Sequence, residues 1–211
     1  MNRKIKALGL ALVAAFAMSA VTASAASAIE FHAGGAHTLL NGSQTGNHSF
    51  TVGSGFGAIT CKVAKFTGTT TKTTEASQVI TPEYKECTDS FGRKVDVTIS
   101  ATYEFTPPAS ATAAANVHVK GSFTLSITNA EGKQICHVEV NAQTNNNIVY
   151  HNVANGDVEV TTTTNNVTTT TAGGVLNCGV GNGHHAGGSY TGDTLLAGTD
   201  TAGNNVNISV S

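Results

Sequence analysis

The chain has 211 residues, with 11 Lys and Arg against 13 Asp and Glu, and a formal charge of −2 at neutral pH. Charged residues make up only 11% of it, against about 25% in an average globular protein; Thr, Asn, Ser and Gly supply the polarity instead. From Gln134 to the end there is no Lys or Arg, which argues against binding nucleic acid or an anionic membrane surface.

The first 28 residues have the layout of a secretory signal peptide. A basic start that includes Arg3 and Lys4 precedes an apolar run, Ala7 to Ala17, and small-residue cleavage sites follow up to Ala28. The alternative is an uncleaved N-terminal anchor. No later apolar run approaches the roughly 20 residues of a membrane-spanning helix. We therefore expect a secreted, extracellular chain, 29–211, forming one domain, with a charge change near residue 133 as a weak indication of two.

The first part of the exported chain predicts short strands. A brief strand is expected around residues 38–40, followed by strands at 48–53 and 58–66 and a Thr-rich hairpin tip at 67–75. Residues 78–80 form a further short strand, whose ladder should end at Pro82 because proline has no N–H to donate. Tyr84 and Cys87 then lead to a turn at 89–92.

Residues 93–142 contain three runs of alternating apolar residues. The first occupies every second position from Val95 to Phe105, the second those from Val117 to Ile127, and the third begins at Cys136. Because successive side chains of a strand point to opposite faces, each run predicts one buried and one solvated face. The runs are separated by Pro107-Pro108 and by a glycine-containing turn at 129–133.

The last third repeats this pattern with weaker apolar residues. Strands are expected near 148–153, 158–164, 167–171, 175–180, 189–197 and 206–210, with turns at Asn155-Gly156 and Asn165-Asn166 and a loop at 181–188. No segment of helical length shows a 3.6-residue period after residue 28. Short strands separated by turns every 8–12 residues predict an all-β, mostly antiparallel β-sandwich.

Four cysteines follow the signal segment, and an even number in an exported chain indicates two disulfides. Three connectivities are open. We favour Cys61–Cys87 and Cys136–Cys178, because each pair closes a local loop of strands. A four-thiolate zinc site is the alternative, but such sites usually contain close C-x-x-C pairs, which this sequence lacks.

Candidate metal ligands and cofactor motifs are weak. His184-His185 lies in a glycine-rich loop, and His32 and His37 flank a glycine pair, but neither cluster has metal-ligand spacing. Gly181-x-Gly183-x-x-Ala186 matches a dinucleotide fingerprint without the helix that it requires. Asn152, Asn155 and Asp157 could supply oxygen ligands to calcium, although such residues are ordinary in turns. We expect no metal and no cofactor.

The sequence contains no catalytic constellation, so we expect no enzyme and no catalytic residue. There is no G-x-S-x-G nucleophile elbow. Asp157 and Glu159 share one face of a strand, as the acids of a glycosidase can, and a cleft joining them to His184 would favour a secreted hydrolase. A carbohydrate-binding module would instead need an exposed row formed by the four tyrosines (Tyr84, Tyr103, Tyr150 and Tyr190), and Tyr103 is expected to face the core.

Several short motifs together resemble a known kind of protein. Cys61-x-Val63-x-x-Phe66-Thr67-Gly68, Thr81-Pro82-x-Tyr84-x-x-Cys87, Cys136-x-Val138 and Tyr190-Thr191-Gly192 resemble small exported β-rich proteins of unknown function from high-GC Gram-positive bacteria. The resemblance implies export and a β fold, and adds no catalytic residue.

These expectations combine into one functional hypothesis. The protein is a non-enzymatic module with a structural or binding role in the cell envelope or the medium, where its partners would be glycans or other envelope components. A carbohydrate-binding module and a secreted hydrolase are the alternatives.

Overall fold

The computed structural model describes residues 29–53, 55–108 and 114–211. The predicted signal peptide, 1–28, lies outside the described residues. The strands are β1 (Phe31–Ala33), β2 (Leu39–Gln44), β3 (His48–Thr51), β4 (Ile59–Thr69), β5 (Thr74–Glu75), β6 (Gln78–Thr88), β7 (Lys94–Thr106), β8 (Ala115–Thr128), β9 (Gln134–Val140), β10 (Gln143–Asn152), β11 (Val158–Ala172), β12 (Gly183–Thr199), β13 (Asn205–Val206) and β14 (Ile208–Val210). A short helix, α2 (Val175–Cys178), precedes β12.

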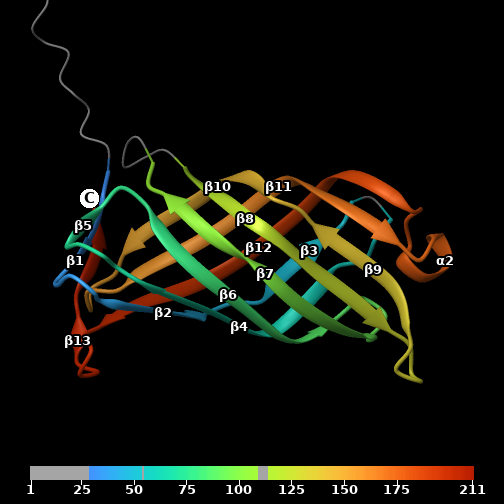
Figure 1. Ribbon diagram of the computed structural model, residues 1–211, viewed down its shortest axis with the longest axis horizontal. Helices are drawn as coiled ribbons and strands as arrows, with labels where there is room; N and C mark the ends of the chain where they lie inside the picture. The colour runs from blue at the N-terminus through green and yellow to red at the C-terminus, as the bar shows by residue number, and fades with distance from the viewer. Residues whose placement is uncertain (1–28, 54, 109–113) are drawn as a thin grey trace, which may run out of the picture.

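The long strands form an antiparallel meander that closes on itself (Figure 1). β4, β6, β7 and β8 pair in sequence, β8 pairs with both β9 and β10, and these pair with β11. β11 pairs with β12, which returns to β2 and β3 and so to β4. If β2 and β3 are counted as one interrupted strand, and β9 and β10 as another, the closed sheet has eight strand positions. The predicted all-β, antiparallel, disulfide-linked fold is confirmed. The two layers expected of the sandwich are formed here by one continuous sheet.

Alternation of apolar side chains builds the interior of this closed sheet. On β7, the predicted inward residues Val95, Ala101 and Tyr103 are buried, whereas Lys94, Asp96 and Thr98 between and beside them are exposed. β8 and β9 keep the same register, since Leu125 lies between Val97 of β7 and Val138 of β9. The buried residues form two clusters, one toward β1 and one toward the disulfides.

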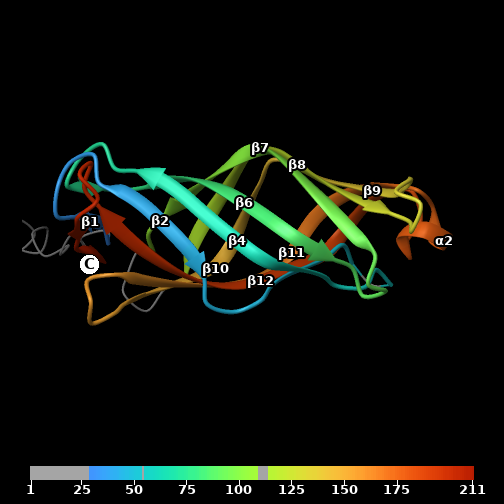
Figure 2. The ribbon, with the colours of Figure 1, turned by 90° about the horizontal axis from the view of Figure 1, so that it is seen from below.

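The two ends of the molecule differ. At one end, β1 pairs with β14 and β5 in a small sheet that joins the first and last described strands. At the opposite end lies α2, as Figures 1 and 2 both show. Phe31 of β1 and Val210 of β14 line the interior cavity described below, so the small sheet forms part of its wall.

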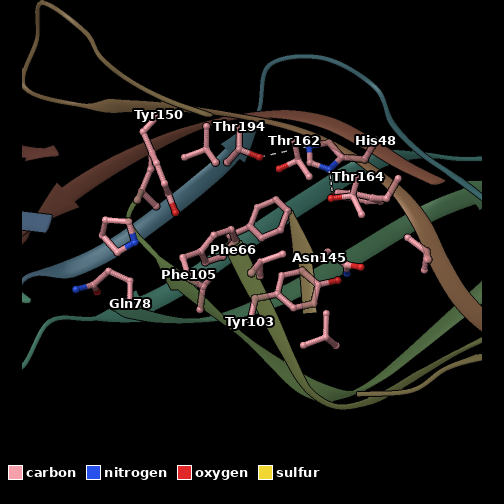
Figure 3. A pocket seen from close by; sticks show the side chains of 18 of the residues that line it. His48, Phe66, Gln78, Tyr103, Phe105, Asn145, Tyr150, Thr162, Thr164 and Thr194 are labelled. Atoms are coloured by element: carbon pink, nitrogen blue, oxygen red, sulfur yellow. Dashed lines mark hydrogen bonds between the residues drawn. The ribbon is translucent and has the colours of Figure 1, made fainter. Parts of the chain in front are cut away.

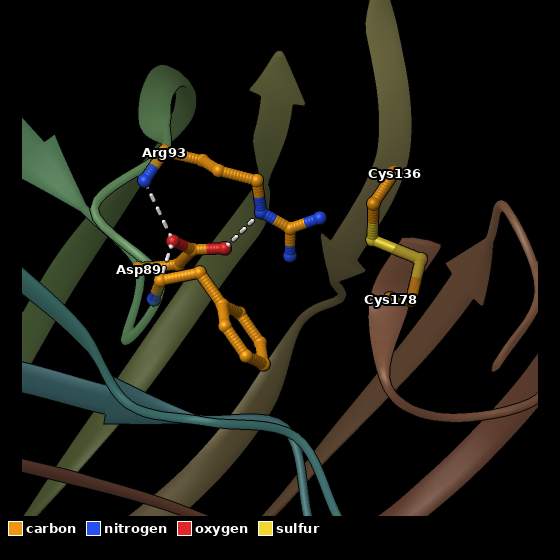
Figure 4. A network of polar contacts seen from close by, with 5 residues as sticks. Asp89, Arg93, Cys136 and Cys178 are labelled. Atoms are coloured by element: carbon orange, nitrogen blue, oxygen red, sulfur yellow. Dashed lines mark hydrogen bonds and ion pairs between the residues drawn. A yellow bond between two sulfur atoms is a disulfide. The ribbon is translucent and has the colours of Figure 1, made fainter. Parts of the chain in front are cut away.

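Three of the hairpin turns share one geometry. In the turn after β6, the Asp89 carboxylate accepts hydrogen bonds from the backbone N–H groups of Phe91 and Arg93 and pairs with the Arg93 guanidinium at 2.6 Å (Figure 4). Asn129 and Asp200 play the same role in later turns. The fourth residue of each is a glycine with positive φ, such as Gly92 at 76°, a conformation that glycine adopts without strain. The predicted turns at 89–92 and 129–133 are confirmed.

Three predictions for the last third are wrong. Asn165-Asn166 is no turn, because β11 continues through it as a bulge in which Asn166 has φ 65°. Residues 175–178 form α2 instead of a strand, because two glycines with positive φ, Gly173 and Gly174, turn the chain toward Cys136. The predicted loop 181–188 belongs largely to β12, where it pairs with β11.

Pro82 interrupts pairing on one side only. β6 stays paired with β4 at this point, with Pro82 opposite Phe66, whereas its pairing with β7 stops after Ile80 and resumes at Cys87. The missing N–H of proline therefore falls where β6 and β7 separate. A surface groove of about 380 Å³ lies along this opening, lined by residues that include Tyr84 and Val97.

Candidate functional site

The interior of the closed sheet is incompletely filled. A cavity of about 80 Å³ lies between the inward faces of the strands, toward the β1 end. Figure 3 shows Phe66 and Tyr103 between a group formed by Gln78, Phe105 and Tyr150 and a group formed by His48, Thr162 and Thr164. Closed sheets of eight strands have an interior just wide enough for side chains or one small ligand. We refer to this space as the interior cavity.

Carbon dominates the wall of the interior cavity. Most of its lining residues are aliphatic or aromatic, and among the described residues that line it there is no Lys, Arg, Asp or Glu. The polar exceptions are Gln78, Asn145, three threonines and the inner histidine and tyrosines. Such a mostly apolar pocket with a few converging polar groups is the usual form of a small-molecule binding site.

A hydrogen-bonded chain of four side chains adjoins the interior cavity. His48 Nδ1 lies 2.5 Å from the Tyr190 hydroxyl, which lies 2.8 Å from the Tyr84 hydroxyl, itself 3.4 Å from that of Tyr103. We call these four residues the histidine–tyrosine chain. A smaller hollow of about 30 Å³ touches all four of its members, so the chain lies between the two hollows.

The direction of the proton donors in this chain follows from its first member. His48 Nε2 lies 3.1 Å from the backbone carbonyl oxygen of Asp193, which can only accept, so Nε2 carries the proton of the neutral ring. Nδ1 then accepts from the Tyr190 hydroxyl. Tyr190 in turn accepts from Tyr84, and Tyr84 from Tyr103, so the chain satisfies its own donors.

Burial controls the titration of the histidine–tyrosine chain. Desolvation lowers the pKa of His48 below its usual 6.5, against smaller opposing effects of Asp193. Desolvation also raises the pKa values of Tyr84, Tyr103 and Tyr190. At neutral pH all four side chains are therefore uncharged.

Gly192 lets the imidazole approach the backbone, since a Cβ at this position would lie 2.4 Å from His48 Nδ1.

The buried neutral His48 predicts a loss of stability in mild acid. Its pKa is lowered in the folded protein, so below about pH 6.5 the unfolded chain takes up the proton first and the free energy of unfolding falls as pH decreases toward the folded value. We expect the urea concentration at which half of the protein is unfolded to decline between pH 7.5 and 5. The decline should be smaller in the variant His48→Leu. Glu75, Glu104 and Asp200 also have lowered pKa values, but from starting values of 4.5 or less, so their effect falls below this window. An unchanged midpoint from pH 7.5 to 5 would contradict the prediction.

The predicted hydrolase residues do not come together. Glu159 pairs with Leu195 on β12, whereas His184 lies near the start of the same strand. Eleven residues at about 3.3 Å each place them roughly 35 Å apart. His184 lies 3.0 Å from Thr170 Oγ1, and His185 lies 2.8 Å from both Thr171 Oγ1 and the Gly181 carbonyl oxygen. Both histidines therefore contact side chains of β11, the strand that pairs with this part of β12.

Of the four tyrosines considered for a sugar-binding row, Tyr103 is buried and the other three are partly buried. Tyr84, Tyr103 and Tyr190 belong to the histidine–tyrosine chain, and Tyr150 lines the interior cavity. Burial raises the pKa of Tyr150 as well. A planar aromatic row facing solvent cannot be formed from these side chains in this fold.

Residues 29–53, 55–108 and 114–211 contain no group of three or more His, Cys, Asp or Glu side chains arranged to hold a metal ion. At the predicted calcium turn, the side chain of Asn152 is used by β14, since its amide donates to the Val210 carbonyl and its oxygen accepts from the Val210 N–H, both at 2.8 Å.

His48 and Gln78 were missed by the sequence analysis as site residues. The signal that could have found them is parity: His48 alternates with Phe50 on β3, and Gln78 alternates with Ile80 on β6. Each is therefore a polar residue in an inward position. Sequence alone does not show that these inward positions converge on one cavity.

Two further results bear on the class of protein. Within the described part of the chain, no helix has the length and apolar character needed to cross a membrane. Comparison with protein-family models, with curated proteins and with solved structures finds no match to this chain. The resemblance to exported β-rich proteins of Gram-positive bacteria therefore stays a prediction, and functional inference rests on the interior cavity itself.

Proposed function

We propose that this is an exported, non-enzymatic binding protein that holds a small apolar molecule inside its closed sheet. The observation that carries the proposal is the interior cavity, a carbon-lined space of about 80 Å³ in the core. Natural cores pack at nearly crystalline density, and each unfilled space lowers stability through lost contacts. An apolar molecule that fills the space recovers those contacts.

The size of the interior cavity limits the molecule that it accepts. An engineered apolar cavity of about 150 Å³ binds benzene or xenon, and this one is about half as large. The ligand should therefore be slender, such as a short alkyl chain or the end of a longer one. Uncharged ligands are favoured because no lysine, arginine or carboxylate lines the described wall.

Export is supported by independent features. Both predicted disulfides are present, Cys61–Cys87 and Cys136–Cys178, and the described residues contain no free cysteine. Disulfides persist in oxidising compartments, and the sequence of residues 1–28 has a signal-peptide layout. We place the protein in the medium or the cell envelope on these grounds.

The two alternative functions have less support. A carbohydrate-binding module would need aromatic side chains on the surface, and the tyrosines point inward. A hydrolase would need Asp157, Glu159 and His184 in one cleft, and the β12 register separates Glu159 from His184. A purely structural role in the envelope would leave the interior cavity without an occupant.

Xenon under pressure tests the proposal on the chain 29–211, using ¹³C–¹H NMR shifts of the methyl groups that line the interior cavity. We expect saturable shifts at Val119, Val160 and Leu196, with little change at the exposed Val79.

Two neighbouring threonines of β11 provide matched variants. Thr162 lines the interior cavity and Thr163 is exposed on the other face. Thr162→Phe should fill the space and weaken xenon binding at least tenfold, with a cost of about 1–3 kcal/mol for overpacking. Thr163→Phe should bind like the parent. Equal shifts at inward and outward methyl groups, or equal binding by the two variants, would reject the interior cavity as a binding site.

A further inference from the structure

The closed sheet is open in its side between β6 and β7. Pairing of the two strands stops after Ile80, which lies opposite Tyr103, and resumes at Cys87, which lies opposite Val95. The strands are out of step by one residue across this stretch, so the ladder cannot continue in one register. Glu86 has φ 52°, a left-handed conformation that is uncommon outside glycine. Over this length, side chains separate the interior from the surface in place of a continuous hydrogen-bonded ladder.

Three spaces lie in series behind this opening. The surface groove of about 380 Å³ and the smaller hollow of about 30 Å³ share Tyr84 and Val97 in their linings. The smaller hollow and the interior cavity share five lining residues, which are His48, Phe50, Tyr103, Phe123 and Tyr190. A side chain that lines two spaces has one of them on either side. A single layer of side chains therefore separates the groove from the hollow, and a second single layer separates the hollow from the interior cavity.

The two members of the outer layer are held differently. The Tyr84 hydroxyl lies 2.8 Å from that of Tyr190 and 3.4 Å from that of Tyr103, so moving Tyr84 would break the histidine–tyrosine chain. Val97 has no polar side-chain atom and is only partly buried. A change of rotamer or a small displacement moves it aside without the loss of a hydrogen bond. Val97 is therefore the part of the outer layer that opens more easily.

Phe123 is the corresponding member of the inner layer. It packs against Phe50 edge to face, with ring centroids 6.3 Å apart, whereas the other three members belong to the histidine–tyrosine chain. The register of β7 and β8 places Phe123 opposite Ile99, and Val97 opposite Leu125. Val97 and Phe123 are therefore diagonal neighbours on the inward face. A path past Val97 and then Phe123 crosses both layers and leaves the histidine–tyrosine chain intact.

We infer that small apolar molecules enter and leave the interior cavity through the opening between β6 and β7, past Val97 and then Phe123. This inference rests on the proposed function. Rotamer changes of exposed side chains take picoseconds to nanoseconds, whereas local unfolding of a paired strand takes microseconds or longer. The alternative entrance is at the β1 end, where the paired strands β14, β1 and β5 form part of the wall. Entry there would require the movement of paired backbone.

The size of residue 97 tests this route. The rate of xenon exchange with the chain 29–211 would be measured by ¹²⁹Xe saturation transfer and by relaxation dispersion of the methyl groups of Val160 and Leu196, which line the interior cavity but not the smaller hollow. Val97→Ala should raise the rate about tenfold and Val97→Ile should lower it about tenfold, which corresponds to about 1.4 kcal/mol in the barrier. Val97 does not line the interior cavity, so the Kd of xenon should stay close to that of the parent.

Val138→Ala is the matched control. Val138 lies in the same row as Val97, on the other side of Leu125, and it is fully buried. It lines none of the three spaces. The variant loses the same two methyl groups from a more buried site, so a general loosening of the fold would raise its exchange rate as well. We expect Val138→Ala to exchange xenon at the rate of the parent.

The outcomes distinguish this inference from the proposed function. If xenon binds but both Val97 variants exchange it at the rate of the parent, or Val138→Ala accelerates exchange as much as Val97→Ala, the inference is wrong and the binding function stands. Val210 lines the interior cavity at the β1 end. Faster exchange in Val210→Ala, with an unchanged rate in Val97→Ala, would place the entrance at that end and also overturn the inference. If the parent binds no xenon, the proposed function itself is wrong.

Discussion

Leu125→Asp should unfold the protein. Leu125 is 3% exposed in the middle of β8, between Val97 and Val138 on the neighbouring strands. An aspartate there would place an unpaired charge in the apolar interior and leave a space where the leucine was. Substitutions of this kind lie at the severe end of measured effects, at about 4 kcal/mol or more. Far-UV circular dichroism and urea unfolding would measure the loss.

The neighbouring residue provides the control for this prediction. Thr124 points to the other face of β8, where it lies opposite Thr98 and Glu139 and is partly exposed. Thr124→Asp should cost no more than about 1 kcal/mol, mainly through repulsion from Glu139. Equal melting temperatures for the two variants would contradict the register of β8.

Removal of the Cys136–Cys178 disulfide should have the second-largest effect. The bond joins β9 to α2 across 42 residues of chain (Figure 4). On the loop-entropy model, a crosslink of this length stabilises the folded state by about 4 kcal/mol. We expect Cys136→Ser combined with Cys178→Ser to lower the free energy of unfolding by that order, measured by urea denaturation without reductant.

Helix α2 supplies a control for the disulfide. Leu176 is 98% exposed, so Leu176→Ala should change stability by less than about 0.5 kcal/mol. A non-reducing peptide map should recover the 61–87 and 136–178 pairs. A double serine variant as stable as the parent, or a map with other pairs, would show that the bond contributes little or does not form in solution.

Alternation and turn chemistry predicted much of the fold. The inward positions of β7, β8 and β9 follow directly from the spacing of residues such as Val95, Leu125 and Val138, because a strand exposes opposite faces in turn. The turn at Asp89 follows from a short side chain that accepts local backbone N–H groups, followed by a glycine. The number of disulfides followed from the even cysteine count, and of the three possible pairings the one favoured for its local loops is the one present.

Local signals failed where distant contacts decide the conformation. Asn165-Asn166 has the composition of a turn, yet β12 pairs along both sides of it and holds β11 as one strand. Val175 and Leu176 look like a strand, but their side chains are 63% and 98% exposed in α2, where the disulfide and two glycines hold the chain. In the first case strand pairing outweighed turn composition, and in the second the disulfide and the glycines outweighed β propensity.

The sequence by itself determined the strand periodicity, the polar outer surface and the presence of two crosslinks, because these depend on neighbouring residues or on a count of cysteines. Only the tertiary structure decided that the sheet closes, since β12 returns to β2 and β3 across more than a hundred residues. Closure is also what brings His48, Gln78 and Tyr150 to one cavity. Alternation tells which side chains point inward, but strand pairing and register determine which of them meet.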